Sequence, residues 1–223
     1  MSHAAPWVWE THRGDAGELH GSTAPTAALR TVREQLVTSP AIVLGSSQSE
    51  HDLDPAAVSA GAVDVVRRRS GGGAVLLTPG AHVWLDVWLP RTDPSWVDDV
   101  GRAGDWLADV WVAAAAALGV PDPRPHRGPL ETGPWSAQVC FTGLGPGEVT
   151  SGSRKLVGVS QRRTRDWARF QCLVHRRWDA AGTFALLSTP GAATAGEEWR
   201  DRVADVGDAG IVPAFRAALD RLA

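Results

Sequence analysis

The sequence of 223 residues contains no tyrosine, one methionine, two cysteines and one lysine. Cys140 and Cys172 lie 32 positions apart without a C-x-x-C spacing, which excludes a disulfide framework and a thiol-based zinc site. The longest uncharged apolar run, Val110 to Val120, is far shorter than the ~20 residues of a membrane-spanning helix. The first residues lack the basic and apolar regions of a secretory signal. We therefore predict a cytoplasmic protein in a reducing compartment, with no membrane partner.

The chain also lacks a strong charge of either sign. Its formal net charge is −3, which argues against a nucleic-acid partner held by a strongly basic face. Hydrophobic residues make up 43% of the chain and charged residues 21%, values that are ordinary for a globular protein and exclude wholesale disorder. We predict one domain over residues 1–223.

The single lysine, Lys155, lies in the stretch SGSRKLVGVSQRR, and every other Lys or Arg position holds arginine. In a chain that uses arginine so consistently, a surviving lysine indicates a place that needs a compact, mobile ammonium close to a reacting oxygen. The alternative is a chance residue on a solvated strand. We take Lys155 as a candidate functional residue.

Local patterns predict an α+β domain with a mostly antiparallel sheet flanked by helices. Strands are predicted over residues 6–9, 41–44, 62–68, 74–77, 83–89, 135–141, 154–160 and 168–174, with 74–89 forming a hairpin. Helices are predicted over 27–37, from the N-cap pair Asp54-Pro55 to Gly61, over 98–118 and over 211–222. Residues 14–28 and 121–134 are expected to be loops.

A glycine-rich segment, Arg67 to Val75 (RRRSGGGAV), is the second candidate feature. Three glycines let the backbone approach a ligand closely and turn its N–H groups toward phosphate or carboxylate oxygens. Arg67 and Arg68 would add charge-assisted hydrogen bonds. The segment has neither the G-K-[ST] of a Walker A loop nor a following helix, and a tight hairpin turn is the alternative. With the lysine stretch, it favours an anionic ligand whose developing charge an ammonium stabilises.

These motifs carry a resemblance. The run RRRSGGGAV, followed further along the chain by CF, an acidic residue and SRKLVGVSQRR, resembles the lipoate-protein ligase A family of the biotin/lipoate ligase superfamily, over Ala41 to Trp178. The resemblance implies a biotin/lipoate ligase-like catalytic domain that uses ATP and Mg²⁺ to form an acyl-adenylate. Lipoate or a related medium-chain acyl group would then pass to a lysine of a lipoyl carrier domain or H protein.

The resemblance also implies roles for individual residues. Lys155 would bridge the acyl carbonyl and the α-phosphate, and Gly158 would permit close approach. Glu148 falls near the acidic residue that the family places before the lysine, where it would help with metal or nucleotide, a solvated hairpin charge being the alternative. The implied acyl-nucleotide site consists of Arg67, Arg68, Ser70, Gly71, Gly72, Gly73, Ala74, Glu148 and Gly158. No metal ligand is assigned.

Cys140 supports a second hypothesis. Related octanoyltransferases use a cysteine in a matching C-F position as an acyl-thioester nucleophile, with acyl carrier protein as the donor, and Cys140-Phe141 fits that pattern. A small buried residue at a strand end is the alternative for this cysteine.

The chain departs from the family pattern in three places. Leu77 stands where the ligases usually have histidine, and Gln171-Cys172 stand where they usually have His-Gly. The sequence also leaves no room for the C-terminal accessory domain of the longer ligases after the last helix, so that a separate accessory chain or a pre-activated acyl donor could be required. These departures leave the acid unassigned and motivate a third hypothesis, a non-catalytic acyl- or nucleotide-binding relative.

Overall fold

The computed structural model describes residues 6–208 and 210–222. Its strands are β1 (Val8–Gly14), β2 (Thr31–Val37), β3 (Ala41–Leu44), β4 (Asp64–Arg67), β5 (Val75–Leu77), β6 (His82–Pro90), β7 (Pro123–Pro125), β8 (Val149–Ser151), β9 (Arg154–Arg163) and β10 (Trp167–His175). Its α-helices are α1 (Ala16–Gly21), α2 (Pro55–Ala60), α3 (Asp105–Ala117), α4 (Ala180–Ala185), α5 (Ala192–Glu198) and α6 (Ile211–Leu222). Two 3₁₀ turns are η1 (Glu50–Asp52) and η2 (Cys140–Thr142).

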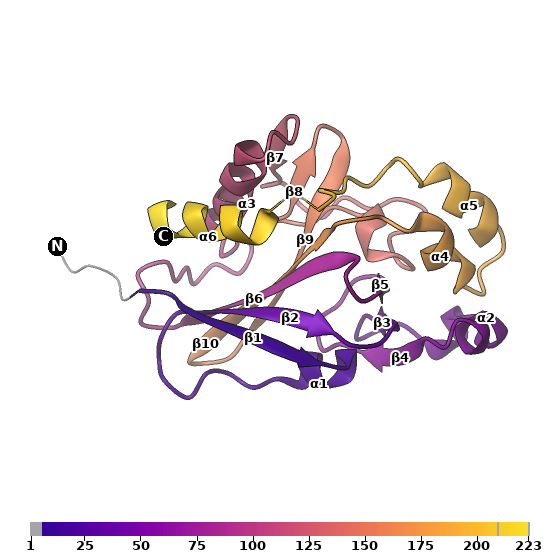
Figure 1. Cartoon of the computed structure of the whole chain (residues 1–223), viewed down its shortest axis with the longest axis horizontal. Coiled ribbons are helices and arrows are strands. Elements are labelled where there is room, and N and C mark those ends of the chain that lie inside the picture. Colours follow the sequence, from indigo (N-terminus) through magenta and orange to yellow (C-terminus); the bar gives the residue numbers. More distant parts are fainter. Residues whose placement is uncertain (1–5, 209, 223) are drawn as a thin grey trace.

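The strands form two sheets. The large sheet has seven strands in the order β1-β2-β6-β10-β9-β8-β7, and the small sheet has three in the order β4-β3-β5. Only the β1/β2 pair of the large sheet is parallel. Figure 1 shows α3 and α6 together on one side of the large sheet and α1 on the other. The predicted α+β fold with a mostly antiparallel sheet is confirmed.

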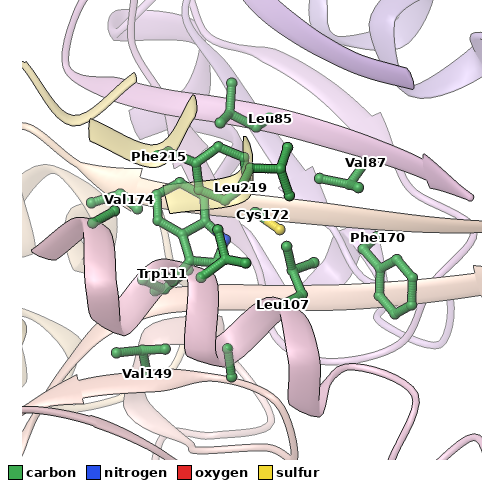
Figure 2. Close-up of a cluster of buried hydrophobic side chains, with 14 of the residues drawn as sticks. Leu85, Val87, Leu107, Trp111, Val149, Phe170, Cys172, Val174, Phe215 and Leu219 are labelled. Atoms are coloured by element: carbon green, nitrogen blue, oxygen red, sulfur yellow. The ribbon is translucent and has the colours of Figure 1, made fainter. Parts of the chain in front are cut away.

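The main core lies between the large sheet and the helices α3 and α6 (Figure 2). Trp111 of α3 is fully buried, and its ring centroid lies 4.3 Å from that of Phe215 on α6. Strand residues such as Leu85 and Cys172 complete this layer. Burial raises the pKa of the Cys172 thiol to about 12, so this cysteine serves as a packing group.

The opposite face of the large sheet packs against the small sheet. Because side chains alternate along a strand, Leu85 faces the main core while Trp84 joins a cluster with Val43 of β3 and Leu19 of α1. The outer face of the small sheet packs on α4 and α5, through contacts that include Ile42 and Phe184. The two sheets therefore enclose the space in which the candidate site lies.

Several predicted elements match the structure. Residues 41–44 form a fully buried strand, and Asp54 caps α2 with hydrogen bonds from the N–H groups of Ala56 and Ala57. The predicted strands 154–160 and 168–174 correspond to β9 and β10, and 211–222 is helical. The helix predicted over 98–118 begins only at Asp105, and Val100 is exposed.

Other predictions were wrong. Residues 31–37 form β2, because pairing with both β1 and β6 outweighs the helical spacing of the apolar residues. Residues 14–28, predicted as loop, contain α1, which begins with an Asp15/Glu18 capping box. The predicted strand 135–141 consists of turns, an isolated bridge from Val139 to Ala74 and the start of η2. The predicted hairpin 74–89 instead crosses between sheets, since β5 pairs with β3 whereas β6 pairs with β2 and β10.

Within the described residues, no helix combines the length and apolar character needed to span a bilayer.

Two buried histidines, His82 and His175, pair across β6 and β10 and should make the fold sensitive to acid. Burial, with nearby Arg176, lowers the pKa of His82 to about 4, and burial, with His82, lowers that of His175 to about 3. The unfolded chain, with ordinary histidine pKa values of ~6.5, binds more protons at pH 5 than the folded chain does. The free energy of unfolding therefore decreases as the pH falls below ~6.5, by about 2 kcal/mol per histidine at pH 5.

Urea unfolding followed by tryptophan fluorescence at pH 7 and pH 5 measures this loss. Between pH 7 and pH 5, the free energy of unfolding of His175→Leu should decrease by about 2 kcal/mol less than that of the native chain. His12→Leu, at a side chain that is 39% exposed, serves as the control and should show the full drop. If His175→Leu loses as much stability between pH 7 and pH 5 as the native chain does, buried His175 is not a source of the acid sensitivity.

Candidate active site

A cavity of about 800 Å³ lies between the two sheets. Its wall combines the glycine loop, residues 71–73, with Lys155 and Gly158 of β9, Gln171 and Leu173 of β10, and residues from the segment 130–148. This volume is within the range of small-molecule sites in proteins. The structure thus brings together the two segments that the sequence singled out.

Lys155 is buried in the wall of this cavity, with a side chain that is 6% exposed. Its Nζ lies 2.7 Å from Oε2 of Glu148 and donates hydrogen bonds to the carbonyl oxygens of Cys140, at 3.1 Å, and Gly143, at 3.0 Å. The ammonium also lies 5.0 Å from the centroid of the Phe141 ring. Three acceptors match its three protons, so the lysine is held in one position.

Glu148 is buried as deeply as the lysine, with a side chain that is also 6% exposed. Its Oε2 accepts from the Gly145 N–H at 2.6 Å and its Oε1 accepts from the Val159 N–H at 3.0 Å. Burial alone would lower the pKa of Lys155, but the Glu148 carboxylate raises it above the ordinary value. Lys155 is therefore a charged ammonium at neutral pH.

A change of register between β8 and β9 directs Lys155 into the cavity. Val149 pairs with Val157, but Thr150 pairs with Lys155, so one extra residue of β9 is accommodated as a bulge. Gly158 lies beside the lysine, and a Cβ there would come 3.1 Å from Phe141 and 3.6 Å from Cε of Lys155. Glycine at this position leaves room for both side chains.

The glycine loop packs between the end of β3 and the segment that precedes η2. A Cβ on Gly73 would lie 2.6 Å from backbone atoms of Val139, whereas a Cβ on Gly71 would meet nothing within 4 Å. Gly72 has φ of +92°, a conformation that favours glycine. The loop therefore needs glycine at positions 72 and 73 for backbone reasons.

Arg68 fixes the shape of this loop and lines the cavity. Its guanidinium donates to the carbonyl oxygens of Gly71 at 2.7 Å, Gly73 at 2.8 Å and Val43 at 3.1 Å. Burial lowers the pKa of Arg68, while the nearby Cys140 opposes that effect. The arginine thus holds the loop and places a positive charge beside it.

Three other residues of the glycine segment, Arg67, Ser70 and Ala74, do not line the cavity. Arg67 points away from the cavity, donates to the carbonyl of Gln48 and is 39% exposed at its side chain. Ser70 accepts a backbone hydrogen bond from Ser46, and Ala74 exchanges backbone hydrogen bonds with Gln138 and Cys140. These three residues connect the loop to neighbouring segments by hydrogen bonds.

Cys140 is partly buried and lines the cavity. Its backbone N–H donates to the carbonyl of Ala74 at 2.9 Å, and its carbonyl accepts from Lys155. The backbone of Cys140 therefore joins the end of the glycine loop to the lysine, and the residue lines the cavity that the second hypothesis requires it to reach.

Sequence reasoning missed His20, which reaches the cavity from α1. Residues 14–28 were assigned to a loop, although Asp15-x-x-Glu18 is a capping-box signal for a helix that begins there. Leu77 and Gln171, the positions that differ from the family pattern, also line the cavity.

A buried lysine, a glycine loop and a cavity between the two sheets together form the candidate site. Comparison with known proteins identifies the family. The chain belongs to the lipoyl protein ligase A/B catalytic domain family, whose sequence model matches residues 29–207. The resemblance over Ala41 to Trp178 is thus confirmed, and the members of this family are enzymes of the ligase and transferase type. Among proteins with curated descriptions, none matches the chain.

Solved structures of lipoate ligases share the fold. A bi-partite lipoate protein ligase from Thermoplasma acidophilum, studied with its E2 lipoyl domain, is 17% identical with a TM-score of 0.73, over 98% of this chain and 82% of that one. A lipoate-protein ligase A bound with ATP is 18% identical with a TM-score of 0.69, over 98% and 83%. Plasmodium falciparum LipL1 in complex with lipoate is 11% identical with a TM-score of 0.65, over 97% and 62%.

The glycine loop offers a matched pair of substitutions. Gly73→Ala should lower the free energy of unfolding by about 2 kcal/mol, since its Cβ would overlap the backbone of Val139. Gly71→Ala, where the added methyl group meets nothing within 4 Å, should change it by less than about 0.5 kcal/mol. Urea denaturation of both variants measures the difference, and equal stability would show that the loop is not held as described.

Proposed function

We propose that the chain is an ATP-dependent ligase that converts lipoate or a related medium-chain acid to an acyl-adenylate and passes the acyl group to a lysine of a carrier domain. The observation that carries this proposal is the buried ammonium of Lys155, held in the cavity wall close to the glycine loop. Membership of the family supports it, as do the ATP-bound and lipoate-bound structures of proteins with the same fold.

In the first step, a carboxylate oxygen of the acid attacks the α-phosphorus of ATP. A phosphorus–oxygen bond forms while the bond to pyrophosphate breaks, and pyrophosphate leaves. Lys155 has three protons and three protein acceptors, so a ligand oxygen replaces the carbonyl of Cys140 or Gly143 as its partner. The ammonium then stabilises charge that grows on the reacting oxygens.

In the second step, the neutral amine of the carrier lysine attacks the acyl carbon. A carbon–nitrogen bond forms, the bond to AMP breaks, and the amine gives up a proton as AMP leaves. Lys155, still paired with Glu148, stabilises the negative charge on the acyl oxygen during this attack. The carrier is a lipoyl domain or an H protein, and a separate accessory chain would fit the bi-partite organisation of the Thermoplasma ligase.

Magnesium would reach the site on the phosphates of ATP, which are its usual ligands. Within residues 6–208 and 210–222, no group of three or more His, Cys, Asp or Glu side chains is arranged to hold a metal. Both oxygens of Glu148 are already occupied by Lys155 and by two backbone N–H groups. We therefore assign Glu148 to positioning the lysine.

The position of Cys140 favours a second candidate, an octanoyltransferase that uses this cysteine. The thiolate would attack the thioester of an octanoyl acyl carrier protein and release the carrier thiol, and a lysine amine of the acceptor domain would then displace the cysteine. Cys140 lines the same cavity as Lys155, and its carbonyl accepts from that lysine.

Removing Lys155 tests the leading proposal. Because a lone buried Glu148 would destabilise the fold, the variant to use is the double substitution Lys155→Met with Glu148→Gln. Formation of acyl-AMP from ATP and lipoate or octanoate, measured by mass spectrometry, should fall by about 10²–10³-fold. Arg154→Met, at the exposed preceding residue, serves as the control and should retain activity. Unimpaired adenylation in the double variant would refute the role of Lys155.

Cys140→Ser separates the two candidate functions. If the chain is an adenylating ligase, the variant should form acyl-AMP within about threefold of the native rate, since serine keeps the backbone bonds of residue 140. Incubation of the native chain with octanoyl acyl carrier protein, followed by intact-mass spectrometry, checks the alternative. A covalent octanoyl group that Cys140→Ser lacks would instead establish the cysteine-dependent transferase.

A further inference from the structure

The floor of the cavity runs from β9 across β10 to β6. Gly158 pairs with Leu173, and Leu173 pairs with Trp84. All three positions line the cavity. Two strand spacings, about 10 Å in total, therefore separate the lysine side of the cavity from its far end at Trp84, a length suited to a medium-chain acyl group.

His20 occupies this far end. Its ring centroid lies 4.4 Å from that of Trp84, and its Nδ1 lies 3.3 Å from Nε2 of Gln171. Both His20 and Gln171 line the cavity. A polar pair thus lies opposite the end of the cavity that contains Lys155.

A buried network holds His20 in this place. Arg169 donates to the carbonyl oxygens of His20, at 2.9 Å, and Leu19, at 3.0 Å, at the end of α1. The same guanidinium pairs with Asp86 at 2.5 Å, and Asp86 also accepts from Gln35 and from Trp84 Nε1. The end of α1 is thereby tied to three strands of the large sheet, β10, β6 and β2.

The imidazole of His20 is neutral. Burial, with the positive charges of Arg169 and Arg68, lowers the pKa of His20 to about 3. With Gln171 donating to Nδ1, the single ring proton is on Nε2, which is then a hydrogen-bond donor. The other side chains at this end, such as Val75, Leu77 and Leu173, are apolar. His20 and Gln171 therefore supply the polar groups of a mainly apolar wall.

We propose that His20 and Gln171 select an acyl chain with a hydrogen-bond-accepting atom near its far end over an unsubstituted hydrocarbon chain of the same length. A plain alkyl end would cover the imidazole N–H and the amide without giving them a partner, which opposes its binding. An oxygen or sulfur atom near the end of the chain accepts from the pair. This inference rests on the proposed function for the orientation of the acid, with its carboxylate at Lys155.

Binding of two acids of matched length tests the proposal, with octanoate as the hydrocarbon and 7-oxooctanoate as the chain with an acceptor. Calorimetry with the full chain should show 7-oxooctanoate binding about tenfold more tightly. His20→Leu should bring the ratio of the two dissociation constants close to one, and His20→Gln, which keeps a donor, should preserve most of it. Equal affinities in the native chain would overturn the proposal.

Two further measurements make the result decisive. His12→Leu, at a partly exposed histidine on β1 that does not line the cavity, should keep the native ratio. If His20→Leu fails to fold, Gln171→Met removes the other half of the pair, and an unchanged ratio in this variant would overturn the proposal.

Acyl-AMP formation from the same two acids separates this inference from the proposed function. A preserved binding ratio without acyl-AMP would support the selecting pair and refute the ligase. Adenylation of both acids with equal kcat/KM would support the ligase and refute the selecting pair.

Discussion

The buried pair of Lys155 and Glu148 is the interaction on which the site depends. Removing two charges from water is costly, and the cost is offset here because each charge meets several partners. The ammonium has three acceptors, and the carboxylate accepts from the lysine and from two backbone N–H groups. These bonds join β9 to the segment 140–148. Loss of one partner would leave an unpaired buried charge, so a substitution of either residue changes both the cavity wall and the stability of the local fold.

The glycine loop is coupled to this pair through Cys140. The backbone of Cys140 receives a bond from Lys155 at its carbonyl and donates to Ala74 through its N–H. Gly73 packs directly on the preceding residue, Val139, with no space for a side chain. A ligand that takes the lysine away from Cys140 therefore acts on a backbone that also carries the loop. Binding at the lysine and the conformation of the loop are linked by one short segment.

The parts of the site that could be predicted from sequence are those set by local chemistry. The single lysine and the glycine triplet stand out in the sequence, and both line the cavity. The partners of Glu148 could not be predicted, because they depend on a bulge in β9 and on a turn at Gly145. Residues 31–37 were assigned to a helix because the spacing of their apolar side chains resembles a helical period, yet pairing on both edges makes them a central strand.

The distribution of charge around the cavity bears on how the proposed acid would be oriented. Lys155 is neutralised by Glu148, and Arg169 is neutralised by Asp86. Arg68 binds only carbonyl oxygens, and no carboxylate among the described residues pairs with it. Its positive charge is therefore uncompensated at the glycine loop, where low polarity strengthens attraction to an anion. At the far end the cavity wall has the neutral imidazole of His20 and the amide of Gln171, and the nearby Arg169 is paired with Asp86. On the function proposed above, this charge would draw an acid in with its anionic end at the loop and leave its tail facing His20.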